Sequence, residues 1–569
     1  MQKTKFFGLG GMQEIGKAGF ILEHEDEIVI IDNGIKFTNS METGVQAIIP
    51  DYQYLVKNNK KIQGLFITHG HEDHMGGIAY LLKQVKLEKI WAPKIAIQFI
   101  QGRLEEHKIP HMPEFIEITK DLNVKTKYFE LDSWTTQHSV PDAFGIRVKT
   151  PNGSVFYTGD YRFDYTPLGN KTDFDKLKQM GDEGMTVLLS DSTNAFSQHH
   201  SPTETNILKD LTKFTKETKG KVIITTFASQ LTRIQALITM AAENKRKVIP
   251  LGRSMVNNVE FAKKAGYIDV PDSTFIDKRD ISKYPDKEIF ILTTGSQGEE
   301  RAGLSRMASG KHAQITLKKG DTVIFSASPI PGNRMKIELL VNQLYKTGVD
   351  IKEHRIDGML HVSGHAYKDE HIKTFELTRP KYFLPFHGSY RMSAVHGVTA
   401  VQTGVKKENV HIPTKGNVMY LHNNELIITD EWEEVGPVYI DSNNVSTSNG
   451  PVIKQRAELG ENGFINVVVV VDKKKNIIIG RTRVISRGAI YAKNSKDLLM
   501  DVQRLAHGAI LHTIKNLKTW TSADIKEAVR KRIEPFFYKT KRRKPIIVTS
   551  VLEFDKNNKP KRETKENSE

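Results

Sequence analysis

The residues that could do chemistry in this chain are concentrated in one short segment, His69-Gly70-His71-Glu72-Asp73-His74. The apolar run before this segment predicts a buried strand, and the apolar run after it predicts the start of a helix. Side chains two residues apart in an extended chain project to the same side, so His69 and His71 can hold one metal ion. Asp73 and His74 follow where the chain turns, and they can face a second ion.

Imidazole and carboxylate ligands together suit zinc, and they suit manganese as the share of oxygen ligands rises. A lone histidine here would be explained as part of a solvated polar loop, but three histidines and an aspartate at this spacing favour a metal site. The segment also resembles the signature motif of the metallo-β-lactamase family. That resemblance implies a two-metal site completed by a further histidine, a bridging aspartate and a last histidine, in that order.

Three later residues match this order, and each is predicted to follow a strand. His138 lies in a loop after a strand, and Asp160 and His387 each close an apolar run. Taken alone, His138 would be an ordinary loop histidine, but the upstream motif and the strand-end position favour a metal ligand. Asp32, at another strand end, either orients a metal ligand or makes a turn with Gly34, and the sequence leaves both open.

The composition of the chain sets the class of protein. A length of 569 residues predicts about three domains. The net charge of +16, from 83 Lys and Arg residues against 67 Asp and Glu residues, fits a nucleic-acid partner and fits a lysine-rich proteome equally well. The absence of cysteine excludes disulfides and thiolate zinc sites. No apolar run suggests a signal peptide or a membrane span of ~20 residues, so we expect no membrane partner and a cytoplasmic protein.

The pattern changes to repeated parallel βα units between about residue 204 and residue 365. Each predicted strand ends in a loop of small residues, such as residues 227–230 and 295–299, and ligands bind at such strand ends. No G-x-G-x-x-G motif lies between strand and helix here, which excludes a dinucleotide site of the Rossmann type. The later strand that carries His387 returns the chain to the metal-binding domain, so the βα domain is an insertion.

The inserted domain and several short motifs resemble the β-CASP branch of the metallo-β-lactamase family and, within it, the bacterial ribonuclease J family. The motifs are Asp191-Ser192-Thr193-Asn194, Thr226-Phe227-Ala228-Ser229, Ser363-Gly364-His365-Ala366 and Pro385-Phe386-His387-Gly388. The histidine at position 387 is similar to the RNA-processing members of the branch, whereas the DNA-repair members carry an apolar residue there. Gln230, Thr232 and Ser389 depart from the family pattern and leave the details of substrate binding open.

The resemblance implies an α/β fold, namely a metallo-β-lactamase αββα sandwich with an inserted β-CASP (Rossmann-like parallel α/β) domain and a small C-terminal α/β domain. The expected parts are residues 1–203 and 369–435 (metallo-β-lactamase domain), 204–368 (β-CASP domain), 436–462 (linker), 463–555 (C-terminal oligomerisation domain) and 556–569 (disordered tail). An apolar face in the C-terminal domain serves self-association or packs on the domain's own sheet. That face consists of Leu498, Leu499, Val502, Leu505 and Ile510.

The resemblance also assigns the site. One metal ion is expected on His69, His71 and His138, the other on Asp73, His74 and His387, with Asp160 as the bridge. Two zinc ions per subunit are expected, with manganese or magnesium as alternatives. The expected catalytic residues are Asp73, Asp191 and His365. His365 serves as general acid or charge stabiliser, unless it is a structural histidine in a tight turn. The expected substrate-binding residues are Ser229, His361, Val362, Ser363, Gly364 and His365.

Three functions follow as hypotheses. The first is a zinc-dependent ribonuclease, a 5′→3′ exonuclease that prefers 5′-monophosphate ends and also makes endonuclease cuts, in mRNA turnover and rRNA processing. The second is a hydrolase of small esters or lactams, which the inserted domain and the basic charge disfavour. The third is a metal-free RNA-binding scaffold, which the full ligand set disfavours. The expected partners are RNA, further copies of the chain in a homodimer or homotetramer, and a paralogue or RNA-degradation complex.

Overall fold

The computed structural model describes residues 2–38, 44–330, 332–441, 444–446, 450–490 and 495–554. The chain forms two compact units, one of Met1–Phe37 and Gln46–Val445, the other of Thr38–Val45 and Ser446–Glu569. Within the described residues, no helix is long and apolar enough to span a membrane. The expected disordered tail, residues 556–569, lies outside the described residues.

Two large β-sheets form the centre of the first unit. The first sheet has the strand order β21-β20-β1-β2-β3-β6-β7-β8. Its strands are β1 (Thr4–Gly10), β2 (Gly19–His24), β3 (Glu27–Ile31), β6 (Ile62–Phe66), β7 (Lys89–Ala92), β8 (Glu114–Glu117), β20 (Asn417–His422) and β21 (Glu425–Trp432). The second sheet has the order β19-β13-β12-β11-β10-β9. Its strands are β9 (Asn123–Lys125), β10 (Glu130–Thr136), β11 (Ala143–Thr150), β12 (Gly153–Tyr157), β13 (Val187–Asp191) and β19 (Tyr382–Phe386).

Alternating side chains hold these sheets and their helices together in four layers. Phe6 and Tyr157 lie in the core between the sheets, whereas their neighbours Phe7 and Phe156 face outward into cores that include helical residues. The helices over the first sheet are α1 (Gln53–Lys57), α2 (Glu72–Met75), α3 (Ile78–Leu81) and α4 (Lys94–Glu106), and those over the second are α5 (Phe174–Asp182), α11 (Lys368–Thr378) and α12 (Tyr390–Gln402). The αββα sandwich confirms the predicted fold of the metal-binding domain.

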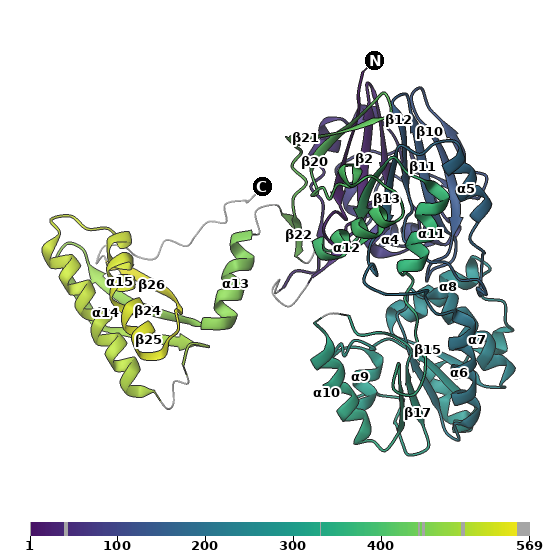
Figure 1. The fold of residues 1–569 in the computed structure, drawn as a ribbon. Coiled ribbons are helices and arrows are strands. Elements are labelled where there is room, and N and C mark those ends of the chain that lie inside the picture. The colour runs from purple at the N-terminus through teal and green to yellow at the C-terminus, as the bar shows by residue number, and fades with distance from the viewer. Residues whose placement is uncertain are drawn as a thin grey trace. The chain divides into compact units, whose positions relative to one another are not determined.

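The inserted domain contains a five-stranded parallel sheet in the order β15-β16-β14-β17-β18. Its strands are β14 (Val222–Thr225), β15 (Lys247–Leu251), β16 (Ile289–Thr293), β17 (Thr322–Phe325) and β18 (Asp350–Glu353). Val222 and Ile224 pack against α6 (Glu204–Glu217), α7 (Leu231–Glu243) and α8 (Arg253–Lys264), whereas Ile223 packs against α9 (Gly303–Ala308) and α10 (Arg334–Tyr345). The labels in Figure 1 place α6 and α7 on one side of this sheet and α9 and α10 on the other.

The connection between the two domains is clear from one strand pairing. The chain leaves the sandwich after β13 and returns with α11 and β19, and β13 and β19 pair in parallel in the second sheet. A parallel sheet with helices on both faces therefore interrupts the sandwich, as predicted from the βα pattern.

The stretch predicted as a linker, residues 436–462, contains regular structure. β22 (Val438–Asp441) pairs with β5 (Ala47–Ile49) in a small sheet that also includes β4 (Lys36–Phe37) and β23 (Asn444–Ser446). Val438 and Ile440 are buried in the same core as Ile49, and this burial explains why the strand forms beside residues typical of turns. Helix α13 (Gly450–Asn462) follows.

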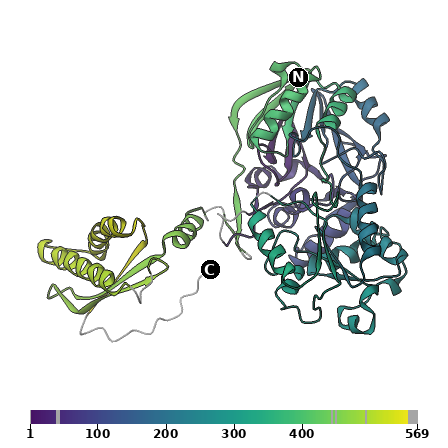
Figure 2. The ribbon, with the colours of Figure 1, turned by 60° about the horizontal axis from the view of Figure 1, so that its bottom comes forward.

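The second unit is built on a three-stranded sheet in the order β25-β24-β26. Its elements are β24 (Phe464–Asp472), β25 (Ile477–Arg487), α14 (Lys496–Asn516), α15 (Ser522–Lys541) and β26 (Ile546–Glu553). Val467 and Val469 share a core with Val502 and Ile510 of α14, and Figure 2 shows the helices beside the strands of this unit. Two of the apolar helix residues expected to serve self-association are therefore part of the unit's own core.

Candidate metal centre

The polar residues of the centre lie where strands of the two facing sheets end. The segment with His69 and His71 follows β6, His138 follows β10, Asp160 follows β12, and His387 follows β19. The φ angle of His387 is +51°, a left-handed conformation that costs about 1–3 kcal/mol for a non-glycine residue and is typical of functional sites. The ends of these strands therefore bring residues that are distant in the sequence close together in space.

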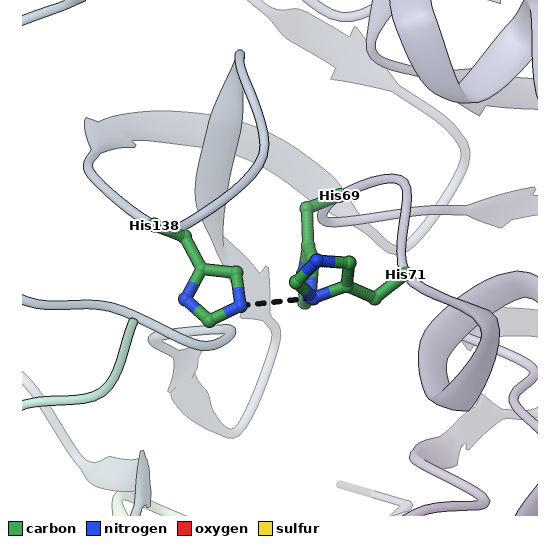
Figure 3. A group of neighbouring side chains, drawn as sticks. All are labelled: His69, His71 and His138. Carbon is green, nitrogen blue, oxygen red and sulfur yellow. Dashed lines mark hydrogen bonds between the residues drawn. The ribbon is translucent and has the colours of Figure 1, made fainter. Parts of the chain in front are cut away.

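The structure brings all the predicted metal ligands together in two groups. The ligand atoms of His69, His71 and His138 lie within 4.8 Å of one another, and Figure 3 shows the three rings converging. A second group, with the same limit, consists of Asp73, His74, Asp160 and His387. The first group offers nitrogen atoms, and the second offers nitrogen and oxygen atoms. Zinc and manganese bind ligand atoms of these types.

Asp160 faces both groups. Its Oδ2 atom lies 3.8 Å from His138 Nε2 in the first group and 3.2 Å from His74 Nε2 in the second. Its Oδ1 atom lies 3.4 Å from His387 Nδ1. This position is the one that a bridging carboxylate requires.

Asp32 orients His74 of the second group, which is one of the two roles that the sequence left open. Its Oδ2 accepts hydrogen bonds of 2.8 Å from His74 Nδ1 and from the Thr68 hydroxyl, and its Oδ1 accepts one of 2.8 Å from Thr68 N. Since the Thr68 hydroxyl donates to Asp32, its oxygen accepts from His69 Nδ1, at 3.0 Å. Both rings are thereby fixed with Nε2 toward the centre. No role was assigned to Thr68 from the sequence, although its position directly before His69 could have indicated one.

Gly364 holds the ring of His138. Its carbonyl oxygen accepts a 2.7 Å hydrogen bond from His138 Nδ1, which turns Nε2 to within 2.9 Å of His71 Nδ1 (Figure 3). A Cβ atom on Gly364 would lie 2.6 Å from the His138 ring, so only glycine fits this close approach. Gly364, predicted to bind substrate, thus supports a metal ligand.

The residues present fit a bound cation. Three buried atoms that face the centre make no hydrogen bond, and they are His69 Nε2, His74 Nε2 and Asp160 Oδ1. Burying a polar atom without a partner costs about 1–3 kcal/mol, and a cation would satisfy all three. Burial and the neighbouring histidines hold the pKa of His69 well below its usual range, so its ring is neutral as a ligand must be. Burial lowers the pKa of His74, but Asp160 and Asp32 outweigh it and raise that pKa to about 10, and a cation would replace this proton.

His365 and Asp191 form a pair beside the second group. His365 Nδ1 donates a 2.7 Å hydrogen bond to Asp191 Oδ2 and lies 3.7 Å from Asp160 Oδ2. Burial lowers the pKa of His365, but the Asp191 and Asp160 carboxylates outweigh burial and raise it above its ordinary value. The side chain keeps 20% of its exposure, so the ring is accessible from solvent. Asp191 is fixed in turn by Thr193, whose N–H and hydroxyl donate to its Oδ1 at 2.9 and 2.7 Å.

The residues predicted to bind substrate fall into two environments. Ser363 lies beside His365, and its hydroxyl oxygen accepts from Asn194 Nδ2 at 2.8 Å and from His365 N at 3.3 Å. Ser229 lies elsewhere, in a groove of about 440 Å³ that also includes Gly70 of the metal segment, Phe227 and Arg253. Asn194 was not singled out from the sequence, although it lies in the motif with Asp191.

His361 and Val362 belong to a buried cluster around Arg233, another residue that the sequence did not reveal. Arg233 is 2% exposed and binds Glu204 through Nη2 at 2.6 Å and Nε at 3.1 Å. Its Nη1 donates to His361 Nδ1 at 2.7 Å and to Gln230 Oε1 at 3.0 Å, and its Nη2 to the Val362 carbonyl at 3.4 Å. The departure at Gln230 thus supplies an acceptor for Arg233. Neither His361 nor Val362 lies in an exposed position, since both are 5% exposed or less.

The fold and the centre together define a metallo-β-lactamase-type protein with a β-CASP insertion. Four family models match the chain: the metallo-beta-lactamase superfamily at residues 16–191, the ribonuclease J beta-CASP domain at 219–344, the Zn-dependent metallo-hydrolase RNA specificity domain at 348–413, and the ribonuclease J C-terminal domain at 451–554. Relatives agree with these models along nearly the whole chain.

The chain is 41% identical over 550 residues to ribonuclease J of Mycoplasma genitalium, covering 96% of each protein. It is 38% identical over 550 residues to ribonuclease J 1 of Streptococcus pyogenes serotype M3, covering 97% of this chain and 98% of that one. It is 31% identical over 556 residues to ribonuclease J2 of Bacillus subtilis, covering 97% and 99%. The chain therefore belongs to the ribonuclease J family.

A solved structure of another protein shares the fold. A protein of unknown function from Enterococcus faecalis V583 aligns with a TM-score of 0.50 at 13% identity, covering 75% of this chain and 100% of that one. At this identity the likeness shows the fold alone.

Proposed function

We propose that the chain is a zinc-dependent ribonuclease that hydrolyses RNA phosphodiester bonds. The observation that carries the proposal is the His365–Asp191 pair beside two metal-ligand groups, the second of which includes Asp160, whose Oδ2 lies 3.8 Å from His138 Nε2 of the first. The two groups would hold divalent ions, which would supply an ionised water molecule and charge stabilisation for an in-line displacement at phosphorus. Membership of the ribonuclease J family supports RNA as the substrate.

The roles of the chain's own residues follow from their positions. The Asp191 and Asp160 carboxylates raise the pKa of His365 and so favour its charged form, in which both ring nitrogens carry a proton. Asp191 accepts the hydrogen bond from Nδ1, and the Nε2 proton is the one donated to the leaving 3′ oxygen. Asp73 lies in the second ligand group, with its Oδ2 atom 3.3 Å from His387 Nε2, and orients the attacking water. Asp191 positions His365 and stabilises its charged form.

The preferred direction of attack is 5′→3′, from ends that carry a single phosphate. Ser363 supports this part of the proposal, because its hydroxyl oxygen accepts hydrogen bonds from Asn194 and His365 and its own proton remains to be donated. A terminal monophosphate beside His365 would accept a hydrogen bond from this hydroxyl. A triphosphate at the same place adds bulk and charge, which weaken its binding. Endonuclease cuts then occur where no 5′ end occupies this position, and mRNA turnover and rRNA processing are the processes that such an activity serves.

The test uses RNA molecules of one sequence with 5′-monophosphate, 5′-triphosphate or 5′-hydroxyl ends, and a fluorogenic ester as a control substrate. We expect rapid stepwise release of nucleotides from the monophosphate form, slower reaction of the other two, and no ester hydrolysis. Equal rates for the three ends would contradict the 5′-end preference. Ester hydrolysis without RNA cleavage would contradict the ribonuclease itself.

Self-association through the C-terminal unit is a further part of the proposal, as a homodimer or homotetramer. The face of its sheet away from α14 and α15 carries exposed apolar side chains at Ile485, Val548 and Leu552. Removing the residues after about position 450 should lower the number of chains per particle, as measured by sedimentation. An unchanged number of chains would place the interface in the first unit.

A further inference from the structure

The positive charge of the chain is divided unevenly along its length. Residues 450–554 contain 22 Lys and Arg residues against nine Asp and Glu residues, whereas residues 1–449 contain 56 against 54. The segment that forms most of the second unit therefore carries +13 of the net charge of +16. A lysine-rich proteome would raise the charge of both segments, so the concentration indicates a property of the C-terminal unit itself.

Exposed cations gather at one end of the sheet in this unit. β24 and β26 run parallel and begin at this end, and the antiparallel β25 finishes there, so Arg487, Phe464 and Ile546 lie in one row. Residues 541–544, Lys-Arg-Arg-Lys, lead from the end of α15 toward the start of β26. We name Arg487 and residues 541–544 the basic ridge.

The ridge has the composition of a nucleic-acid surface. All its side chains are exposed, and across the described residues none of them pairs with a carboxylate. Arg542 and Lys544 lie 5.7 and 5.4 Å from the centroid of the Tyr538 ring, which is 45% exposed. An aromatic ring on which a base can stack, with cations beside it for phosphates, is the arrangement that binds single-stranded nucleic acid.

Other cations of the same unit are arranged differently. Arg530 binds Glu527 at 2.8 Å and Glu534 at 3.3 Å, Lys531 lies 3.6 Å from Glu527, and Arg504 pairs with Asp501. Their charge is locally balanced, so they contribute little to the field that attracts a polyanion. The ridge and these paired cations can therefore be compared directly.

We propose that the basic ridge is an RNA-binding surface that holds the sugar–phosphate backbone of a substrate segment other than the one being cut. The inference rests on the proposed ribonuclease function. Two binding regions on one chain raise the effective concentration of RNA at the catalytic unit, so the ridge strengthens the binding of long substrates and not of short ones.

The binding experiment uses full-length protein with Asp73→Ala, so that RNA is bound without being cut. The ridge variant is Arg487→Gln, Arg543→Gln, Lys544→Gln, and it keeps Arg542 because that residue ends α15 in a left-handed conformation with φ +54°. The control variant is Arg504→Gln, Arg530→Gln, Lys531→Gln, which removes the same charge from paired positions. A third variant, Arg487→Lys, Arg543→Lys, Lys544→Arg, keeps the charge of the ridge.

Affinity for a single-stranded RNA of about 30 nucleotides, longer than one binding site of about 4–16, is measured by fluorescence anisotropy at several salt concentrations. Each phosphate contact contributes about −0.7 to the slope of log affinity against log salt. We expect the ridge variant to have a slope shallower by about 2, and the control and charge-keeping variants to match the parent. Equal losses in the ridge and control variants would show that net charge alone matters. A loss in the charge-keeping variant would show a structural role instead, and either result overturns the proposal.

Hydrolysis separates this inference from the function on which it rests. In proteins with Asp73 intact, the ridge variant should cut a trinucleotide as fast as the parent, while its KM for long RNA rises about tenfold or more, the loss expected for several phosphate contacts. If the parent cuts neither RNA, the proposed function fails. If the parent cuts both and the ridge variant has an unchanged KM for long RNA, only the ridge proposal fails.

Discussion

Two buried polar clusters in the first unit differ in whether their atoms have partners. Around Arg233, the guanidinium meets Glu204, Gln230, His361 and the Val362 carbonyl. At the metal centre, His69 Nε2, His74 Nε2 and Asp160 Oδ1 lie close to other charged groups but make no hydrogen bond. A cluster whose buried polar atoms all hydrogen-bond one another stabilises the fold. A cluster whose polar atoms point to one place and make no hydrogen bond indicates a binding site for a group that is not part of the chain.

The segment of residues 361–365 joins the two clusters. His361 and Val362 bind Arg233 in the inserted domain, and Gly364 and His365 bind His138 and Asp191 in the sandwich. Ser363 lies between them. Only a few residues therefore separate the two clusters along the chain. The following variants distinguish the structural role of the Arg233 cluster from the ligand-binding role of the metal centre.

The largest expected effect is loss of hydrolysis in Asp73→Ala and in His74→Ala. Each removes a member of the unsatisfied cluster, and the loss of a group that orients or deprotonates the attacking water costs roughly 10²–10⁴-fold in rate. The measurement is the rate of hydrolysis of 5′-monophosphate RNA. Circular dichroism and RNA binding show whether each variant keeps its fold. Glu72→Gln is the matched control, since Glu72 lies in the same segment but binds Arg103. Cleavage retained in rigorously purified Asp73→Ala protein would remove Asp73 from the mechanism.

The next effect is on stability, in Arg233→Met. Removing one partner of a buried ion pair costs about 3–5 kcal/mol, because Glu204 is left buried without its bidentate donor. Urea unfolding measures the loss, and the metal content of the folded protein should stay the same. Lys264→Met is the control, because its pair with Glu260 is exposed at both ends and is worth about 0–1 kcal/mol. A stable Arg233→Met protein with lost metal would mean that the two clusters are one functional unit.

A smaller effect is expected in Asp32→Asn, because Asp32 acts on the metal centre only through its hydrogen bonds to His74 and Thr68. The amide keeps the size of the carboxylate but loses the charge and one acceptor that orient His74 and Thr68. Loss of such an outer partner lowers metal affinity about 10–100-fold. Competition with a zinc chelator measures it, and Asp26→Asn at an exposed turn is the control. If affinity is unchanged, Asp32 only shapes the backbone.

An effect no larger than that of Asp32→Asn is expected in Ser363→Ala, since Ser363 lies between the clusters. Loss of one hydrogen bond to a charged phosphate costs about 1.5–3 kcal/mol, or roughly ten- to hundredfold. The preference for monophosphate over hydroxyl ends should narrow by up to that factor, while internal cleavage of a circular RNA stays nearly intact. Equal impairment of circular and linear RNA would assign Ser363 to the position of His365 and not to recognition of the end.

Much of the fold was predictable from local pattern. Alternating apolar residues in the strands and parallel βα units from residue 204 onward indicated the sandwich and its insertion, because side-chain period and loop length reflect the pleat and the crossover directly. The apolar face of α14 was recognised too. Only the structure shows that Val502 and Ile510 pack on the unit's own sheet, since a helix pattern does not specify which surface covers it.

The sequence by itself also determined which residues could hold metal, because ligand type and spacing at strand ends are local properties. Only the tertiary structure decided which groups orient them. His138 and Gly364 are 226 positions apart, and His361 and Arg233 are 128 apart, so no local pattern links them. Hydrogen bonds depend on atoms within about 3 Å, and chain folding alone decides which distant residues come that close. That His361, Val362 and Gly364 bind substrate stays a prediction from the family resemblance, and the structure adds that they hold His138 and Arg233 in two different clusters.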